Sequence, residues 1–152
     1  MSVRAIPDGY YSLTPYLVCK GAAKAIEFYA KAFGAQEIVR MPGPNGQVMH
    51  AEVKIGNSML MLSDENSERG QLSPQSIGGT ATSIMFYSDD VDAVFKRAVS
   101  LGATSEMAPA DQFWGDRMGN LVDPFGHKWA IATHKEDVSP EEMQKRMQAI
   151  GT

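Results

Sequence analysis

Polar and apolar residues alternate over residues 47–55, and a second, mainly apolar segment follows at residues 58–63 after a Gly-Asn turn signal. This pattern predicts two antiparallel strands joined as a hairpin. In residues 22–33 the apolar side chains recur at helical spacing instead, and Gly34 follows as a C-terminal cap. The first half of the chain is therefore expected to place a helix ahead of a hairpin.

Two shorter strands are predicted on either side of that helix, at residues 13–19 and 36–41. Pro15 lies in the first of them and cannot donate a ladder hydrogen bond, which favours an edge strand. Residues 64–79 are rich in serine, asparagine, glycine and acidic residues, which is typical of a loop or linker.

The second half of the chain repeats this order of elements. Strands are expected at residues 81–88, 104–107, 113–122 and 127–133, with a helix that begins at residue 91 and ends before Gly102. At an offset of 68, Gly34-Ala35 corresponds to Gly102-Ala103, which supports a tandem repeat. A final helix at residues 139–150 opens with serine, proline and two glutamates.

Composition narrows the classes of function. A chain of 152 residues with 43% hydrophobic residues and a net charge of −4 is expected to be globular. A pI of about 5.3 argues against a nucleic-acid partner, because such partners favour a basic face. No segment approaches the ~20 apolar residues of a membrane span. The single cysteine, Cys19, excludes an internal disulfide and a Cys-based zinc site, so a cytoplasmic protein is expected.

Four segments of the repeat resemble the vicinal oxygen chelate superfamily, also called the glyoxalase/bleomycin-resistance/dioxygenase superfamily. They read PYLVCKGAAKAIEFYAKAFGA, HAEVKIGNSMLML, DDVDAVFKRAVSLGA and WGDRMGNLVDPFGHKWAIATH, and they cover nearly all of residues 13–134. The combination of HAEVKIG with DQFWGDR and DPFGHKW is most similar to the PhnB-like branch.

The resemblance implies an α+β fold with two tandem β-α-β-β-β modules, whose curled mixed sheets surround a cleft, and a C-terminal helix. The whole chain would form a single domain. Its expected parts are a first module at about 12–63, a linker at 64–79, a second module at about 80–134 and a helix at about 139–150. The resemblance also implies a homodimer, with cleft residues drawn from one or both chains.

In the metal-using branches of the superfamily, four side chains hold a divalent ion. The resemblance places those four positions at Thr14, Met61, Ser83 and Ala130. Such an ion prefers carboxylate or imidazole ligands, which none of the four supplies. We therefore expect no metal and no cofactor at these positions, and no metal-dependent glyoxalase or dioxygenase chemistry of the usual kind.

Strand alternation supports this assignment of positions. The four lie on the faces opposite the large apolar residues, which are expected to pack against the helices. Those apolar residues are Leu13, Leu17, Leu60, Leu62, Ile84, Phe86, Trp129 and Ile131.

Two groups of polar residues are candidates for chemistry in the cleft. Alternation places His50 and Glu52 on one face, where they could transfer protons; a salt-bridged surface pair, or a displaced metal site with His134, are the alternatives. Trp114 could form an aromatic wall, and Arg117 could hold an anionic group.

The remaining cleft candidate is Tyr16, as a wall or hydrogen-bond donor. For the second polar group, the alternatives are that Trp114 packs at a dimer seam and that Arg117 pairs with Asp116 or Asp111.

Two classes of function remain open on the sequence. The first is a small-molecule-binding protein that lacks the usual metal ligands, comparable with the drug-sequestering members of the superfamily. The second is an enzyme, a lyase, isomerase or dioxygenase, with a non-standard metal site or an acid/base pair. The four missing ligands favour binding.

Overall fold

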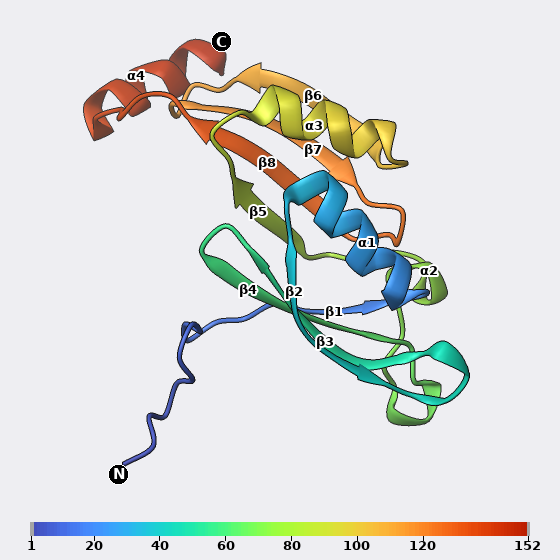
Figure 1. Ribbon diagram of the computed structural model, residues 1–152. Coiled ribbons are helices and arrows are strands. Elements are labelled where there is room, and N and C mark those ends of the chain that lie inside the picture. Colours follow the sequence, from blue (N-terminus) through green and yellow to red (C-terminus); the bar gives the residue numbers. More distant parts are fainter. Residues whose placement is uncertain (1, 152) are drawn as a thin grey trace. The chain divides into compact units, whose positions relative to one another are not determined.

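The computed structural model describes residues 2–151. The chain forms two units: unit 1 comprises Met1–Ala81 with Pro124–His127, and unit 2 comprises Thr82–Asp123 with Lys128–Thr152. Each unit is a four-stranded sheet with a helix against one face (Figure 1). The two units repeat the order β-α-β-β-β, as the sequence predicts.

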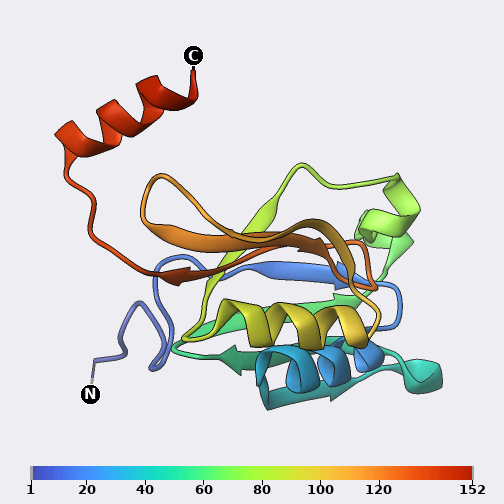
Figure 2. The same ribbon diagram turned by 90° about the horizontal axis from the view of Figure 1, so that it is seen from above.

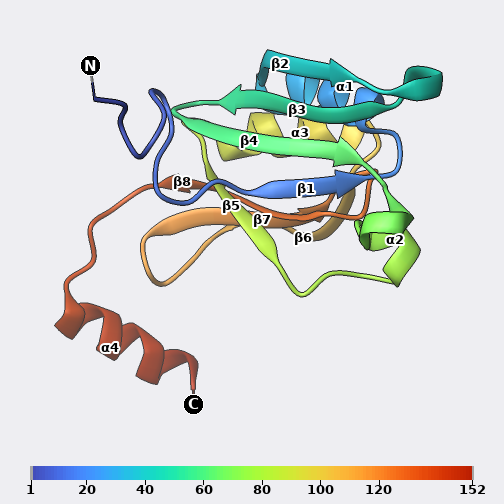
Figure 3. The ribbon, with the colours of Figure 1, turned by 90° about the horizontal axis from the view of Figure 1, so that it is seen from below.

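The sheet of unit 1 has the strand order β1-β4-β3-β2 (Figure 3). Its elements are β1 (Tyr16–Cys19), α1 (Ala22–Phe33), β2 (Gln36–Pro42), β3 (Val48–Ile55) and β4 (Ser58–Asp64), with a short 3-10 turn η1 (Pro44–Gly46). β1 pairs with β4 in parallel and lies at the edge, which confirms the reading of Pro15. The Gly34 cap of α1 is also confirmed, with φ 70° and ψ 25°.

The core of unit 1 lies between α1 and one face of this sheet. The periodic apolar residues of α1 are buried there, and so are the alternate residues of the strands, which include Leu17, Ala51, Val53, Leu60 and Leu62. Tyr29 is fully buried and stacks on Phe33 with ring centroids 5.9 Å apart. Side chains such as Tyr16 and His50 stand on the other face of the sheet, opposite α1, which is called the open face below.

The linker of unit 1 carries two short helical turns, η2 (Ser67–Arg69) and α2 (Pro74–Ile77). The turn Pro124–His127 also belongs to this unit. His127 Nε2 lies 2.8 Å from the carbonyl oxygen of Val18, and the Phe125 ring contacts those of Phe28 and Tyr29.

Unit 2 has the strand order β5-β8-β7-β6, with α3 packed on one face (Figure 2). Its elements are β5 (Ser83–Tyr87), α3 (Val91–Ser100), β6 (Thr104–Asp111), β7 (Asp116–Val122), β8 (Lys128–His134) and α4 (Pro140–Ile150). The side chain of Asp90 accepts a hydrogen bond from the amide of Ala93 and so caps the N-terminus of α3.

α4 differs from α3 in that none of its residues is buried. It follows an extended segment and stands away from the strands of unit 2 (Figures 1 and 2). Arg146 ties it back by donating to the carbonyl of Phe113 at 3.0 Å and to Glu136 at 2.6 Å. Within residues 2–151, no helix is long and apolar enough to cross a membrane.

Three expectations need correction. Leu13 is 90% exposed rather than packed against a helix, because β1 begins only after Pro15. The strand expected at 104–107 extends to Asp111, and the strand expected from residue 113 begins at Asp116. β7 begins only at Asp116 because residues 112–115 form a hairpin turn, in which the amide of Gly115 bonds to the carbonyl of Gln112 at 3.2 Å.

Candidate functional site

The open face of unit 1 gathers aromatic, thioether and ionisable side chains. The strand register sets Tyr16 beside Met61, and Met61 beside Glu52. His50 lies beside Met41 in the neighbouring row. Tyr16 is 44% exposed and Met41 55% exposed, so this face offers apolar surface as well as polar groups.

A chain of polar contacts crosses this face. The hydroxyl of Tyr16 lies 3.1 Å from Nδ1 of His50, and Nε2 of His50 lies 3.7 Å from Oε1 of Glu52. Tyr16 comes from β1, whereas His50 and Glu52 are two residues apart on β3, so alternation alone places the latter two on the same face. The sequence prediction that they share a face agrees with these distances.

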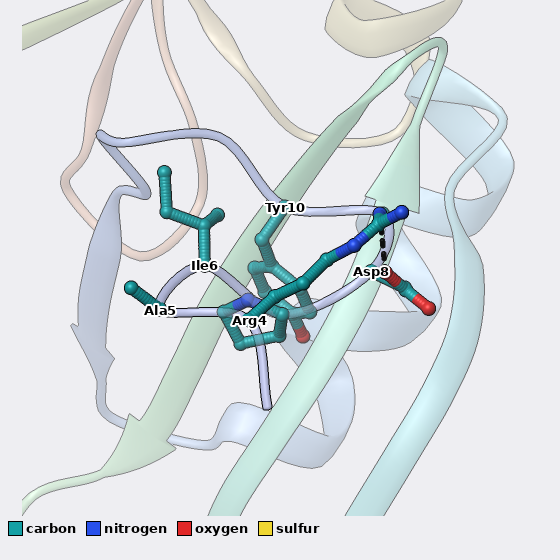
Figure 4. A pocket seen from close by; sticks show the side chains of 7 residues that line it. Arg4, Ala5, Ile6, Asp8 and Tyr10 are labelled. Carbon is teal, nitrogen blue, oxygen red and sulfur yellow. Dashed lines mark hydrogen bonds and ion pairs between the residues drawn. The ribbon is translucent and has the colours of Figure 1, made fainter. Parts of the chain in front are cut away.

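Tyr10 extends this chain from outside the sheet. Its hydroxyl is hydrogen-bonded to Glu52, and burial together with that bond and the nearby carboxylate charge raises the pKa of Tyr10 to about 12. A turn places the residue, since the amide of Tyr10 bonds to the carbonyl of Pro7 at 3.1 Å. Residues 4–10 line an open hollow of about 430 Å³. Arg4 and Asp8 form an ion pair at its edge at 3.0 Å, and their side chains are drawn in Figure 4.

In unit 2 the corresponding open face carries a cluster centred on Asp116, which is 4% exposed. One carboxylate oxygen accepts from the hydroxyl of Tyr87 at 3.0 Å and from Nε1 of Trp114 at 3.2 Å. The other lies 2.7 Å from Nδ1 of His134. Burial raises the pKa of Asp116, but the bonds from His134, Tyr87 and Trp114 outweigh burial and the net direction is downward.

His134 is held on both ring nitrogens, because its Nε2 lies 2.8 Å from Asp137. The hydrogen bonds to Asp137 and Asp116 raise the pKa of His134, which favours the imidazolium form. Because both ring nitrogens of His134 are engaged by carboxylates, the imidazolium links β7 to the segment after β8 and has no free nitrogen to accept a proton.

Arg117 lies on the opposite face of unit 2 from the one expected. Its guanidinium donates to both carboxylate oxygens of Asp92 in α3, at 2.9 and 3.0 Å, and to Asp111 at 3.3 Å. The register pairs Arg117 with Thr133, whose hydroxyl accepts from the first amide of α3 and so marks the helix side. The expected place beside Trp114 is therefore wrong, whereas the alternative pairing with Asp111 is present.

The other sequence candidates lie as follows. Ser83 and Ala130 both stand on the open face of unit 2, where Ala130 pairs with Met85. Trp114 lies in the turn between β6 and β7, with its ring 5.0 Å from that of Phe113. Thr14 precedes β1 and is half-buried.

Comparison with known proteins identifies the family. The sequence model of the Glyoxalase/Bleomycin resistance protein/Dioxygenase superfamily matches residues 12–131. The chain belongs to this superfamily. An uncharacterized protein of Mycobacterium tuberculosis, Rv0887c, is 43% identical over 143 residues, which is 92% of this chain and 84% of that protein.

Solved structures of other proteins share the fold. Protein PA1353 of Pseudomonas aeruginosa superimposes with a TM-score of 0.69 at 21% identity, over 83% of this chain and 99% of the other. A PhnB protein of Bacillus cereus, described as a putative 3-demethylubiquinone-9 3-methyltransferase, gives a TM-score of 0.64 at 19% identity, over 81% and 99% of the two chains. At these identities the likeness shows the fold alone.

The superfamily raises the question of a divalent metal, and the side chains at the expected positions do not fit one. Met61 and Ala130 hold equivalent places, because each pairs in parallel register with an open-face residue of the first strand, Tyr16 or Met85. A thioether and a methyl group are not ligands for a hard or borderline cation. Among residues 2–151, no group of three or more His, Cys, Asp and Glu side chains is arranged to hold a metal ion.

Sequence reasoning missed two contributors to these faces. Tyr10 lies in a segment without strand or helix periodicity, so nothing in the pattern connects it to Glu52. Asp116 lies near Trp114 and Arg117 in the sequence, but nothing in the pattern shows that its carboxylate joins Tyr87 and His134, because the register of β7 with β8 is not set by either strand alone.

Proposed function

We propose that this chain is a small-molecule-binding protein of the glyoxalase/bleomycin-resistance superfamily, and that it binds without the superfamily's four-ligand metal centre. The open face of unit 1 is the proposed binding surface. The observation that carries the proposal is the Tyr16–His50–Glu52 chain, set among the apolar side chains of Met61 and Met41. Binding sites for small molecules combine mainly apolar walls with a few placed polar groups, as this surface does.

The composition of the surface also favours a ligand with an extended apolar part. Methionine side chains adapt to varied shapes, and an exposed tyrosine ring offers a flat wall with a polar tip. Val39, which pairs with Glu52, adds a half-buried apolar edge. A small and highly charged ligand would leave this apolar surface unused.

The methionines allow a direct test, because methyl-labelled methionine reports on each surface separately. In a screen of aromatic compounds followed by NMR, binding is expected to shift the methyl signals of Met61 and Met41. Met147 on the exposed face of α4 is the internal control. Shifts confined to α4, or to unit 2, would contradict the proposed surface.

Metal analysis of the purified protein tests the proposal that binding needs no metal ion. The protein is incubated with Ni, Co, Zn, Mn or Fe(II), desalted and analysed for bound metal. We expect no metal above background, because the donor set at Thr14, Met61, Ser83 and Ala130 is unsuitable. Near-stoichiometric metal would overturn this expectation and direct attention to His50, Glu52 and His134.

A second candidate function is metal-independent proton-transfer catalysis on the same surface. It is favoured by one observation, the placement of His50 between the Tyr16 hydroxyl and the Glu52 carboxylate. A histidine oriented by a carboxylate can act as a general base. His50→Gln and Glu52→Gln would then lower kcat for a bound compound far more than they weaken its binding, whereas a pure binding protein converts nothing.

We further propose a homodimer, which the superfamily resemblance implies, and a cytoplasmic location, which the single cysteine favours. Size-exclusion chromatography with light scattering tests the first part, since a dimer has twice the 16.6 kDa of one chain.

A further inference from the structure

One hydroxyl on the open face of unit 1 stands out by its lack of a partner. Ser63 is 2% exposed, and among the residues that the structure describes its Oγ is the buried side-chain polar atom without a hydrogen bond. Buried polar groups are nearly always paired, and leaving one unpaired costs roughly 1–3 kcal/mol. Such an atom therefore calls for an explanation by the site around it.

The strand register locates Ser63 on the proposed binding surface. On β4 it stands two residues after Met61, so alternation gives both side chains the same face. It pairs with Val18 of β1. On the other side of β4, Leu62 pairs with Ala51 of β3. Because the two strands are antiparallel, the β3 residue beside Ser63 is His50.

Tyr16 and His50 close over this position. β4 lies between β1 and β3, and neighbouring strands are about 4.8 Å apart. The Tyr16 hydroxyl and His50 Nδ1 meet at 3.1 Å, and their ring centroids are 5.6 Å apart, so the two side chains bridge β4. Tyr16 is the strand neighbour of Met61, and His50 is the strand neighbour of Ser63. The contact between Tyr16 and His50 therefore crosses β4 diagonally, over Met61 and Ser63.

We propose that the Ser63 hydroxyl is a concealed anchor for the ligand of this surface. The ligand class is a planar apolar molecule that carries a hydroxyl or carbonyl oxygen. Its flat body lies on Tyr16 and Met61, and its oxygen separates Tyr16 from His50 and forms a hydrogen bond with Ser63 Oγ. This inference rests on the proposed function and adds to it the atom that recognises the ligand's oxygen.

The chemistry of the surface supports this class. Ser63 can donate or accept one bond, and His50 Nδ1 becomes available once Tyr16 moves away. Tyr16 is 44% exposed, so its ring can swing outward without losing a packed core position. The anchor therefore becomes reachable through a side-chain movement alone, with the sheet unchanged.

Two probes and two variants test the anchor. The probes are 2-naphthol, which has the oxygen, and 2-methylnaphthalene, which has the same body without it. Affinities are measured by NMR titration of methyl-labelled methionine for the wild type, for Ser63→Ala and for the control Ser58→Ala. Ser58 lies on the same strand but is exposed, and its hydroxyl donates to Oδ1 of the neighbouring Asn57.

We expect Ser63→Ala to weaken 2-naphthol binding roughly tenfold, or about 1.4 kcal/mol, and to leave 2-methylnaphthalene within about twofold. The same variant should keep or raise the urea midpoint, because it removes an unpaired buried hydroxyl. A fall in the midpoint would instead mean that Ser63 bonds to an ordered water, which would overturn the proposal. Equal naphthol affinity in wild type and Ser63→Ala would overturn the anchor while leaving the surface intact.

The Ser63 anchor and the proposed binding surface can be disproved separately. If neither probe shifts the Met61 methyl signal of the wild type, both the anchor and the proposed surface are wrong. If naphthol shifts Met61 but the His50 side-chain nitrogen signals stay unchanged, the ligand does not separate Tyr16 from His50. In that case the anchor is wrong and the surface stands.

Discussion

Asp64 in unit 1 and Thr133 in unit 2 both accept hydrogen bonds from the N-terminus of the helix in their own unit. Each lies at the end of the strand that pairs in parallel with the first strand, and each caps the helix of its own unit. Oδ1 of Asp64 accepts from the amides of Gly21 and Ala22 at 3.0 and 2.8 Å. The hydroxyl of Thr133 accepts from the amide of Val91 at 2.9 Å. The repeat thus extends to the way that each sheet holds its helix.

Asp64 should contribute more stability than Thr133. Its second oxygen also accepts from the amide of Val48 at 2.7 Å, so one charged side chain satisfies three backbone donors. We expect Asp64→Ala to cost about 2–3 kcal/mol of the free energy of unfolding and Thr133→Val about 1–2 kcal/mol. Urea unfolding followed by circular dichroism measures both.

The matched control for these variants is Asp8→Ala. Asp8 has an exposed side chain that forms an ion pair with Arg4, so its loss should change stability by less than about 0.5 kcal/mol. An Asp64→Ala cost no larger than that of Asp8→Ala would contradict the capping role.

The repeat itself was readable from the sequence, but its spacing was not constant. The offset of 68 describes the ends of the helices, whereas 69 residues separate Tyr16 from Met85 and Asp64 from Thr133. The offset is 69 ahead of the helices and 69 again at the ends of β4 and β8, so the two units differ by one residue only between these points, which include the ends of α1 and α3. Local periodicity fixes each element, but only the strand pairing fixes which residues of the two units correspond.

Gly119 should be intolerant of any side chain. It lies on the α3 side of β7, and a Cβ there would stand 2.9 Å from the carbonyl oxygen of Met107 and 2.9 Å from the Phe95 ring. One of these contacts is backbone and cannot move aside alone. We expect Gly119→Ala to destabilise the protein by about 1–3 kcal/mol, measured from the urea midpoint.

Gly151→Ala is the control for this substitution. A Cβ at Gly151 would meet its nearest neighbours at 3.7 and 3.9 Å, which is ordinary contact. Its stability should therefore match that of the wild type. If Gly119→Ala were equally neutral, the close approach of α3 to β7 would be wrong.

The candidate site was less predictable than the fold, for a physical reason. Alternation within one strand correctly paired His50 with Glu52, because both belong to β3. Contacts such as Tyr10 with Glu52 join segments far apart in the chain, and no periodic pattern encodes them. Arg117 was misplaced because its face depends on register with β8 across a turn whose length the sequence leaves open.

The pH dependence of stability should carry the signature of His134. Hydrogen bonds to Asp137 and Asp116 raise its pKa in the folded protein. Its contribution is then fully present below the unfolded value of about 6.5 and is lost as the pH rises through the raised folded value. The urea midpoint of wild type minus that of His134→Gln should therefore be larger at about pH 6 than at about pH 9.

Asp116 acts in the opposite direction and at a lower pH. Its folded pKa is lowered, so its contribution is present above the unfolded value of about 3.9 and is lost as the pH falls. Measurements between about pH 6 and pH 9 therefore isolate the histidine. A midpoint difference that stays constant over this range would mean that His134 is not charged by its two carboxylates.

Arg117 provides the last prediction, because the sequence and the structure assign it different roles. In the structure its guanidinium is engaged by Asp92 and Asp111, and these bonds raise the pKa of Arg117 and hold it on the α3 side. Arg117→Met should therefore lower thermal stability modestly and leave 2-naphthol affinity within about twofold of the wild type. Tyr16→Leu, which removes the aromatic wall of the proposed surface, should weaken the same probe by at least about fivefold. If Arg117→Met weakened 2-naphthol binding more than Tyr16→Leu did, Arg117 would belong to the ligand site, and the binding surface would lie in unit 2.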